Sequence, residues 1–376
     1  MRTGSSSSGA TSTPTMAPSI LGGLGVASQE LCSTDPNSWP TLSLKVGILG
    51  IIQLKCVSNA AFTNQVVIAV TYVVDQSGAG QYKTIQDAIN AVPDNNDKWY
   101  QIIVKPGLYR EKVIIPNTKP NIYMVGDEKQ FPSIEFDDHQ NNTQSLASAF
   151  NVDTFGSATF TVNADNFVAK NIKFKNTYNL GEKPGHITQA VAVLVGGDKA
   201  AFYNCAFEGV QDTLCDFQGQ HYFRDCYIKG GMDFIFGQAQ SVYENCNLNA
   251  IGGSWGNHGY VTAQGRGAAT DENGFVFKWC NITADKDNTI YLGRAWRSFS
   301  RVVFYKSNFQ ASIAPHGWDA WNKPVDNIVY AEEECYGPGS NKAGRVAWER
   351  KLSVKELYYY INDFNHGKSW LPQQPS

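Results

Sequence analysis

Short runs of alternating hydrophobic and polar residues dominate the chain from residue 66 onward. Residues 66–70 and 72–74 are rich in β-branched side chains and predict a strand. Residues 84–87 resemble a capping box, so we expect a short helix from there through Ala91, ending before Pro93. Short β-branched and aromatic runs separated by Gly and Asn follow. Helical periodicity returns only near the end, where we expect a short C-terminal helix at residues 352–364 that packs back on the fold.

A six-residue pattern recurs along the middle of the chain. Most copies have a polar residue, then Cys or Ile, then an apolar residue two positions later. The copies start at residues 169, 202, 223, 243 and 277, so they are 33, 21, 20 and 34 residues apart. A spacing near twenty, with insertions in some turns, is typical of a solenoid in which each coil adds one strand to every sheet. We therefore predict an all-β fold, a right-handed parallel β-helix, whose loops on one side build a groove suited to a polymer.

Four of the eight cysteines occupy the same place in this pattern: Cys205, Cys226, Cys246 and Cys280. Because side chains alternate along a strand, all four should point the same way and stack in one column. We expect them to point inward as buried thiols. A disulfide between adjacent coils is the alternative, since roughly 4.8 Å separates neighbouring strands. The cysteines form no CxxC pair and the six histidines do not cluster with them, which argues against a structural zinc site.

The first 65 residues differ in composition from the rest of the chain. Residues 1–28 are rich in Ser, Thr, Gly and Pro, which predicts disorder. Residues 42–54 are apolar like the core of a signal peptide, but this stretch is too short for a membrane-spanning helix. We therefore expect a disordered or targeting leader at residues 1–65 and one domain at residues 66–376. Two N-glycosylation sequons, at residues 141–143 and 281–283, are compatible with secretion.

Charge and motif content argue against several classes of protein. The net charge of −3 and the lack of a basic stripe disfavour nucleic acid as the main partner. The chain contains no Gly-x-Ser-x-Gly and no His-Glu-x-x-His, which mark serine hydrolases and zinc proteases. Its many aromatic residues suit stacking on sugar rings as well as core packing.

Two aspartates stand out because each lies among apolar residues. Asp212 and Asp233 are 21 residues apart, the same interval as Cys205 and Cys226, so we expect them at equivalent positions on adjacent coils. Burial and mutual repulsion would push their pKa values apart, which suits one as a nucleophile and the other as a proton carrier. The alternative is that each merely caps a turn.

Five motifs occur in the order and approximate spacing of the pectinesterase signatures, and the chain resembles that family from about residue 73 to about residue 372. They are Gly-Leu-Tyr-Arg-Glu (107–111), Gln-Ala-Val-Ala-Val (189–193), Gln-Asp-Thr-Leu (211–214), Asp-Phe-Ile-Phe-Gly (233–237) and Leu-Gly-Arg-Ala-Trp (292–296). The resemblance implies an esterase that converts methyl-esterified polygalacturonate to pectate and methanol in cell-wall modification, with no cofactor and no metal. We interpret residues 107–111 as structural.

The resemblance also implies a role for each polar residue of these motifs. Asp233 matches the nucleophile that forms an acyl-enzyme anhydride, and Asp212 matches the general acid and base. Gln189 and Gln211 match the amides that stabilise the tetrahedral oxyanion. Arg294 matches the guanidinium that orients the nucleophile and keeps it ionised; a surface ion pair is the alternative.

Two aromatic residues are candidates for substrate binding, and two positions depart from the family pattern. Trp296 should stack on a sugar ring, and Phe234 is a second candidate for the groove wall; Phe234 and Phe236 fit a core position equally well. Cys215 stands where the family usually has an aromatic residue, so one wall of the groove is expected to be missing. Ala295 stands where the family usually has Pro, so a looser loop is expected there.

The expected partner is methyl-esterified homogalacturonan (pectin), with a proteinaceous pectinesterase inhibitor as a second partner. We expect a secreted, monomeric protein of the cell wall without a membrane span. Residues 1–65 are too short and too polar for the inhibitor-like helical pro-region of many plant members. Two alternatives stay open: a noncatalytic pectin-binding protein that kept the groove, and another β-helix enzyme that cleaves the polymer, a lyase or a polygalacturonase.

Overall fold

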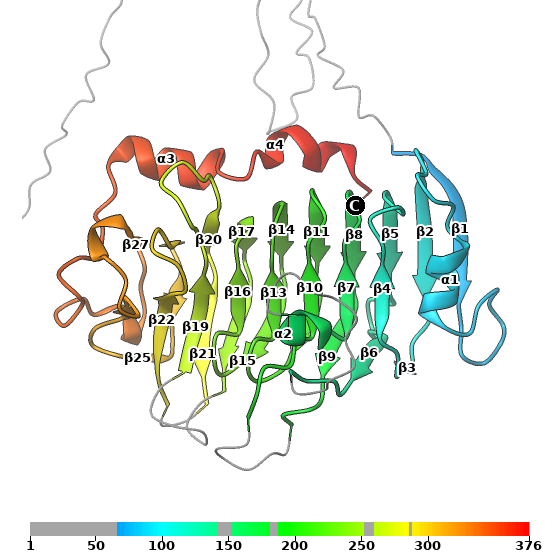
Figure 1. Cartoon of the computed structure of the whole chain (residues 1–376), viewed down its shortest axis with the longest axis horizontal. Helices are drawn as coiled ribbons and strands as arrows, with labels where there is room; N and C mark the ends of the chain where they lie inside the picture. Colours follow the sequence, from blue (N-terminus) through cyan, green and yellow to red (C-terminus); the bar gives the residue numbers. More distant parts are fainter. Residues whose placement is uncertain (1–65, 141–151, 181–186, 252–258, 286–287, 376) are drawn as a thin grey trace, which may run out of the picture. The chain divides into compact units, whose positions relative to one another are not determined.

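The computed structural model describes residues 66–140, 152–180, 187–251, 259–285 and 288–375. The chain winds through three parallel sheets, adding one strand to each sheet per coil, so the predicted right-handed parallel β-helix is confirmed (Figure 1). The leader expected at residues 1–65 and the sequon at residues 141–143 lie outside the described residues. Among the described residues, no helix is long and apolar enough to cross a membrane.

Each sheet is built from every third strand of the repeat. The ten-stranded sheet contains, in spatial order, β1 (Ile68–Val74), β2 (Trp99–Val104), β5 (Ile122–Val125), β8 (Phe167–Lys170), β11 (Ala200–Tyr203), β14 (Gln220–Arg224), β17 (Gln240–Glu244), β20 (Gly274–Lys278), β23 (Arg301–Tyr305) and β27 (Val329–Glu333). The eight-stranded sheet contains β3 (Leu108–Tyr109), β6 (Ser133–Phe136), β9 (Lys173–Asn176), β12 (Ala206–Glu208), β15 (Tyr227–Gly230), β18 (Asn247–Ala250), β21 (Asn281–Ala284) and β24 (Asn308–Phe309). The nine-stranded sheet contains β4 (Val113–Ile115), β7 (Phe160–Val162), β10 (Val193–Val195), β13 (Leu214–Asp216), β16 (Ile235–Gly237), β19 (Gly259–Gln264), β22 (Thr289–Ala295) and β25 (Ser312–Ile313), with β26 (Trp318–Asp319) also paired to β22.

The turn from the ten-stranded to the eight-stranded sheet explains the repeated sequence pattern. Its first residue adopts a left-handed backbone conformation in successive coils, a conformation that Asn and Asp tolerate best among non-glycine residues. These residues are Asn171, Asn204, Asp225, Asn245, Trp279, Lys306 and Glu334. Their side chains also bond between coils: Asn204 Nδ2 donates to Asn171 Oδ1 at 2.9 Å, and Asn245 Nδ2 donates to Asp225 Oδ1 at 2.6 Å. The polar residue of the repeat is therefore the corner of the coil.

The residue after this corner points into the solenoid. Cys205, Cys226, Cys246 and Cys280 are buried free thiols in the main core, so the inward, unpaired prediction is confirmed and the disulfide alternative is wrong for these four. Successive thiols bond to backbone carbonyls of the preceding coil; Cys226 Sγ, for example, lies 3.4 Å from Phe202 O. A column of stacked aromatic rings runs beside them, through Phe202, Phe223, Tyr243, Phe277 and Phe304.

The predicted N-terminal elements form with small changes in their limits. One strand, β1, replaces the two adjacent runs expected at residues 66–74 and begins at Ile68. The helix α1 (Ile85–Ala91) begins after Thr84, whose Oγ1 accepts from the backbone N of Asp87 at 3.2 Å, as the capping pattern predicts. A five-residue helix α2 (Val152–Gly156), which precedes β7, was not predicted.

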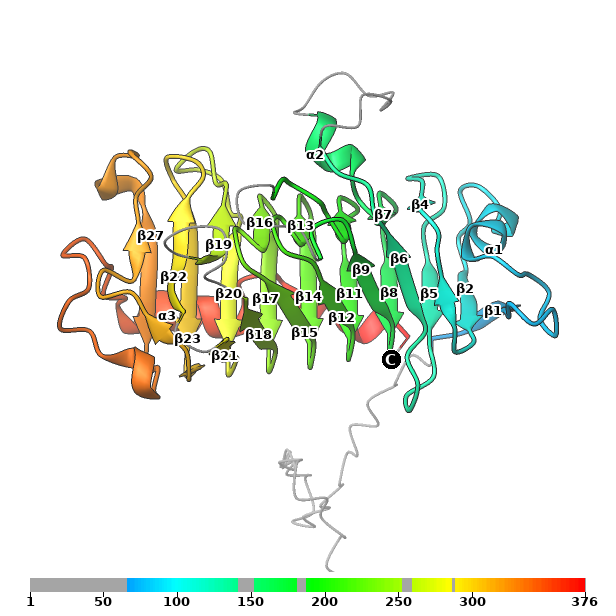
Figure 2. The same cartoon turned by 90° about the horizontal axis from the view of Figure 1, so that it is seen from below.

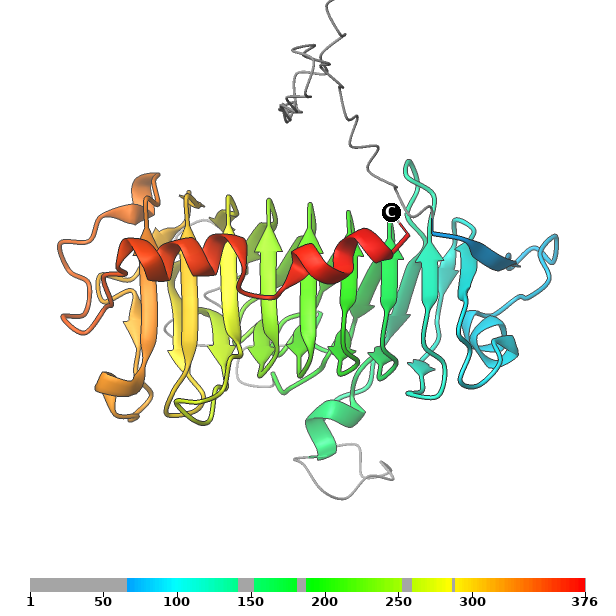
Figure 3. The same ribbon diagram turned by 90° about the horizontal axis from the view of Figure 1, so that it is seen from above.

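The C-terminal segment covers the outer face of the ten-stranded sheet (Figures 1 and 3). The predicted helix is confirmed as α3 (Val354–Asn362), which begins with a capping box between Ser353 and Glu356. The helix α4 (Gly367–Trp370) follows. Outward-facing side chains of the sheet, such as Val242 and Val276, pack against apolar residues of this segment. The remaining short helices are η1 (Val325–Asn327), η2 (Pro338–Ser340) and η3 (Leu371–Gln373).

Candidate active site

Asp212 and Asp233 occupy the same corner of two adjacent coils, where the eight-stranded sheet turns into the nine-stranded sheet. The preceding residues, Gln211 and Met232, pair in a parallel bridge, and Asp212 N donates to Met232 O at 3.0 Å. Both aspartates have left-handed backbone conformations, with φ of 61° and 48°. This geometry confirms the prediction of equivalent positions one strand apart, and it presents both carboxyl groups on the same side of the coils.

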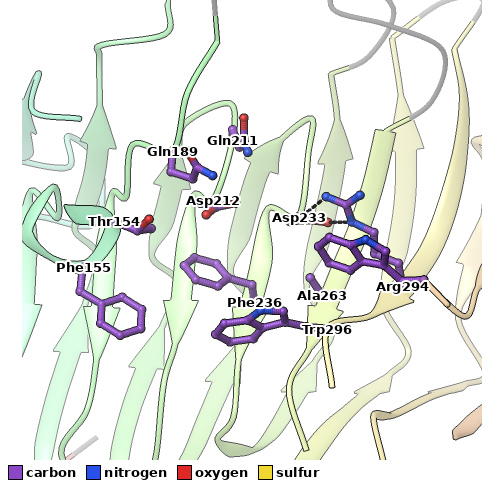
Figure 4. A pocket seen from close by; sticks show the side chains of 11 residues that line it. Thr154, Phe155, Gln189, Gln211, Asp212, Asp233, Phe236, Ala263, Arg294 and Trp296 are labelled. Atoms are coloured by element: carbon purple, nitrogen blue, oxygen red, sulfur yellow. Dashed lines mark hydrogen bonds and ion pairs between the residues drawn. The ribbon is translucent and has the colours of Figure 1, made fainter. Parts of the chain in front are cut away.

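The two carboxyl groups face a cleft of about 230 Å³ on the outer face of the nine-stranded sheet (Figure 4). The same cleft is lined by all the polar residues that the sequence motifs predict, together with aromatic residues of neighbouring coils and of α2. The lining residues are Thr154, Phe155, Gln189, Gln211, Asp212, Asp233, Phe236, Ala263, Arg294, Trp296 and Trp321. Four of the five motifs, together with α2, β19 and Trp321, therefore meet in one concave site although they are far apart in the sequence.

Arg294 holds the carboxylate of Asp233 through two hydrogen bonds. Its Nε donates to Asp233 Oδ1 at 2.7 Å, and its Nη2 donates to Asp233 Oδ2. This bidentate geometry fixes the plane of the carboxylate as well as its charge. Arg294 extends from β22, where it pairs with Ala263 of β19 on one side and Asp319 of β26 on the other. The alternative of a surface ion pair does not apply, because both side chains are largely buried.

The two aspartates differ in the charges around them. Burial raises the pKa of Asp212 well above its ordinary value, and the negative charge of Asp233 raises it further, against a smaller opposing effect of Arg294. Burial also raises the pKa of Asp233, but the hydrogen bonds and the charge of Arg294 oppose that rise directly. Asp212 is therefore the more easily protonated of the two and Asp233 the more easily ionised, the separation expected of an acid and a nucleophile.

Two glutamine amides lie beside the aspartates on the side of the cleft nearer the N-terminal coils (Figure 4). Gln189 and Gln211 belong to successive coils, and the backbone N of Ala190 donates to Gln211 O at 3.3 Å. The side-chain oxygen of Gln189 accepts from the hydroxyl of Thr188 at 3.1 Å, which sets the orientation of the amide. Figure 4 shows both amides on the Asp212 side of the cleft.

The aromatic wall of the cleft differs from the prediction at one residue. Trp296 lines the cleft as expected and contacts Phe236 edge-to-face, with ring centroids 6.1 Å apart. Phe234 does not line it: this side chain is fully buried in the main core, so its assignment to the groove wall is wrong. Asp233 forms the corner of the coil, and the residue after this corner, Phe234, points into the solenoid. In the strand β16 that follows, the side chain of Phe236 faces outward, toward the cleft.

The two departures from the family pattern leave the site intact. Cys215 is buried beneath the cleft, paired in register with Leu194 and Phe236, while Phe155, Phe236 and Trp296 supply aromatic surface around it. Ala295 is not in a loop but ends the strand β22, and Trp296 N donates to Gln264 O at 3.2 Å. The looser loop expected there is therefore not found, because strand pairing holds the backbone that carries Arg294.

Sequence reasoning missed the aromatic pair around Arg294. Its guanidinium carbon lies 4.5 Å from the ring centroid of Tyr260 and 3.9 Å from that of Trp321. Neither ring belongs to a motif that points to chemistry, and the available signal was only the Trp-Asp-Ala-Trp segment at residues 318–321. Among the described residues, no group of three or more His, Cys, Asp or Glu side chains could hold a metal ion.

Several known proteins with similar sequences and structures are pectinesterases by name. The Pectinesterase family model matches residues 71–365. The chain is 47% identical to probable pectinesterase 29 of Arabidopsis thaliana, over 80% of this chain and 89% of that protein. The structure resembles pectin methylesterase from carrot, with a TM-score of 0.72 and 33% identity over 81% of this chain and 96% of that one. It also resembles a pectin methylesterase in complex with a hexasaccharide, with a TM-score of 0.68 and 25% identity over 81% and 98% of the two chains.

Proposed function

The chain belongs to the pectinesterase family, and from this premise we propose that it hydrolyses methyl esters of polygalacturonate, with Asp233 as the nucleophile. The observation that carries this proposal is the pair of carboxyl groups on adjacent coils, one bound by a guanidinium and the other not. A carboxylate next to a protonated carboxyl group supplies both the nucleophile and the acid that ester cleavage needs.

In the first half of the reaction, an oxygen of ionised Asp233 attacks the ester carbonyl carbon of a galacturonate. The carbonyl oxygen takes up the negative charge, and the amides of Gln189 and Gln211 donate hydrogen bonds to it; loss of one such donor typically raises the barrier by about 3 kcal/mol. The bond to the methoxy oxygen then breaks, and Asp212 gives its proton to that oxygen. Methanol leaves, and an anhydride links the sugar to Asp233.

In the second half, ionised Asp212 takes a proton from a water molecule that attacks the galacturonate carbonyl carbon of the anhydride. The anhydride bond breaks, Asp233 leaves as a carboxylate held again by Arg294, and the sugar leaves as a carboxylic acid that ionises in solution. Asp212 is protonated once more and ready for the next ester. The first half of the cycle thus begins from the protonation states that the surroundings of Asp212 and Asp233 favour, and the second half restores them.

The decisive experiment is methanol release from methyl-esterified pectin by the wild-type protein and by Asp233→Asn. The amide is a poor nucleophile, so release should fall by about 10³-fold or more. The matched control is Asp326→Asn in η1, an exposed residue away from the cleft, which should behave like the wild type. Equal release by wild type and Asp233→Asn would rule out this mechanism. New reducing ends would indicate that the polymer backbone is cut instead.

The cellular setting follows from the substrate. Methyl-esterified homogalacturonan is a cell-wall polymer, so we place the protein in the secreted, cell-wall fraction and propose that it acts there as a monomer. As partners we propose methyl-esterified homogalacturonan, bound in the cleft as substrate, and a proteinaceous pectinesterase inhibitor. Fractionation of the native protein, its size in solution and its inhibition by such a protein test these three statements separately.

A further inference from the structure

The guanidinium of Arg294 contacts two aromatic rings, which together we call the slot. Tyr260 of β19 forms one wall, at 4.5 Å from the guanidinium carbon, and Trp321 forms the other, at 3.9 Å. Contact with both rings restricts the movement of the guanidinium, which donates two hydrogen bonds to Asp233. The slot therefore determines how Arg294 meets the carboxylate of Asp233.

A single carboxylate, that of Asp319, ties the two walls together. Asp319 Oδ2 accepts from the hydroxyl of Tyr260 at 3.0 Å, and Asp319 Oδ1 accepts from the backbone N of Trp321 at 2.7 Å. Trp321 has a left-handed backbone conformation, φ 46°, which an aromatic residue adopts only when its surroundings hold it. Asp319 also pairs in register with Arg294, so the residue that holds both rings lies on the strand next to that of the guanidinium.

We infer that Asp319 is a positioning residue of the active site: it fixes Tyr260 and Trp321 as the walls that hold Arg294 in bidentate contact with Asp233. The inference rests on the proposed function, because it assigns Asp319 to the same reaction. Asp319 does not line the cleft, and it acts on the nucleophile through Arg294 rather than through the substrate.

The charge of Asp319 has a second effect, which separates positioning from a purely structural role. Four titratable or charged groups of neighbouring elements interact with Asp233: Arg294 of β22, Asp319 of β26, Tyr330 of β27 and Asp212 at the corner before β13. The negative charge of Asp319 raises the pKa of Asp233, in opposition to Arg294. Removal of that charge with one of the two hydrogen bonds kept should therefore favour the ionised nucleophile down to lower pH.

The kinetic test compares two substitutions of Asp319 with one control. Asp319→Ala frees both walls, and kcat should fall about 10- to 100-fold with little change in KM, as expected when a catalytic group is misplaced. Asp319→Asn keeps an acceptor for Tyr260 or for Trp321 N, so it should recover most of kcat, and the acidic limb of its kcat/KM profile should move to lower pH. Asp326→Ala, an exposed neighbour in η1, is the control and should match the wild type.

A double-mutant cycle decides whether Asp319 acts through Arg294. In an Arg294→Ala background the slot holds nothing, so Asp319→Ala should cause no further loss of kcat. A full additional loss in that background would overturn the inference, as would a wild-type kcat for Asp319→Ala. If Asp319→Ala is poorly folded, Tyr260→Phe is the replacement: it keeps the ring and removes only the hydroxyl bond to Asp319, so it should lower kcat with an unchanged melting temperature.

A measurement that needs no catalysis separates this inference from the proposed function. A guanidinium held by two hydrogen bonds exchanges its Nε proton slowly, and the NMR signal of Arg294 is assigned by its loss in Arg294→Lys. The signal should persist in Asp319→Asn and broaden or vanish in Asp319→Ala. If the wild type releases no methanol but these signals behave as stated, the esterase proposal fails and the positioning inference stands. If the signal is unchanged in Asp319→Ala, the positioning inference is wrong.

Discussion

At the scale of single residues, the site depends on two aspartates in the same backbone conformation but with different neighbours. Asp212 and Asp233 both form left-handed corners, which Asp tolerates better than most residues. Arg294 compensates the negative charge of Asp233, whereas a negative charge on Asp212 would be largely uncompensated. An ionised Asp212 is therefore costly to the fold, and the proposed reaction uses the proton that this cost keeps on Asp212.

This cost predicts how Asp212→Asn changes stability with pH. The pKa of Asp212 is raised in the folded protein, so the folded state binds this proton more tightly than the unfolded state. The resulting stabilisation is complete below an unfolded pKa of about 3.9 and is lost as pH rises through the raised pKa. Asn cannot ionise, so Asp212→Asn should melt several degrees higher than wild type at pH 8, with a smaller difference at pH 4. Melting curves at both values test this.

The control for this prediction is Asp326→Asn, which removes an exposed carboxyl group outside the cleft. Its melting temperature should follow that of the wild type at both pH values. A difference between Asp212→Asn and wild type that is larger at pH 4 than at pH 8 would contradict the assigned direction of the pKa shift.

At the scale of elements, the first family signature serves the fold and not the reaction. The carboxylate of Glu111 accepts from the backbone N of Ile85 at 3.0 Å and from that of Gln86 at 3.1 Å, at the first turn of α1. Tyr109 is fully buried, and its hydroxyl donates to Lys105 O at 2.9 Å. The signature thus joins the first coils to the helix α1 that packs at their end, in agreement with its structural interpretation.

Glu111→Ala should therefore lower stability without changing the chemistry. Loss of a charged acceptor at a helix N-terminus costs about 1–2 kcal/mol. The kcat of methanol release should stay near the wild-type value below the melting transition, because α1 lies outside the cleft. Urea denaturation measures the loss. The exposed Glu128, also an acidic residue of the N-terminal coils, provides a control, and Glu128→Ala should stay within about 0.5 kcal/mol of the wild type. A large fall in kcat for Glu111→Ala would assign this signature to catalysis.

At the scale of the whole domain, the cleft and the C-terminal segment lie on different sheets of the solenoid. The nine-stranded sheet carries the cleft, whereas the outer face of the ten-stranded sheet is covered by α3 and α4 (Figures 2 and 3). Trp370 of α4 is almost fully buried against that face, and its Nε1 donates to Asn365 O at 3.0 Å. The C-terminal segment therefore keeps a second apolar surface of the solenoid out of water.

Trp370→Ala should destabilise the domain by about 3 kcal/mol or more, since it removes a large buried ring and leaves a cavity. Catalysis should be unaffected at temperatures where the domain stays folded, because Trp370 packs against the ten-stranded sheet and the cleft lies on the nine-stranded sheet. Tyr358→Ala removes an exposed ring of the adjacent helix α3 and is the matched control, with little expected effect. Equal stability of the two variants in urea would show that the C-terminal segment does not stabilise the solenoid.

The sequence alone determined the architecture and the chemical groups of the site. The repeat near twenty residues and the period-two alternation predicted a parallel β-helix, the inward column of Cys205 to Cys280, and Asp212 and Asp233 on adjacent coils. These predictions succeeded because in a solenoid the distance between two residues is set by their separation in the sequence. The motifs also led to Gln189, Gln211, Arg294 and Trp296 at the cleft.

Only the tertiary structure decided which side chains follow a corner into the core and which side chains of distant segments come into contact. Phe234 is in the core because the left-handed corner at Asp233 interrupts the alternation from which a residue's face is inferred. The slot of Tyr260 and Trp321 around Arg294 joins β19 and β22 to a segment after β26, and no local pattern encodes such a contact. Propensity and periodicity act between near neighbours, whereas the packing of one side chain on another depends on the completed fold.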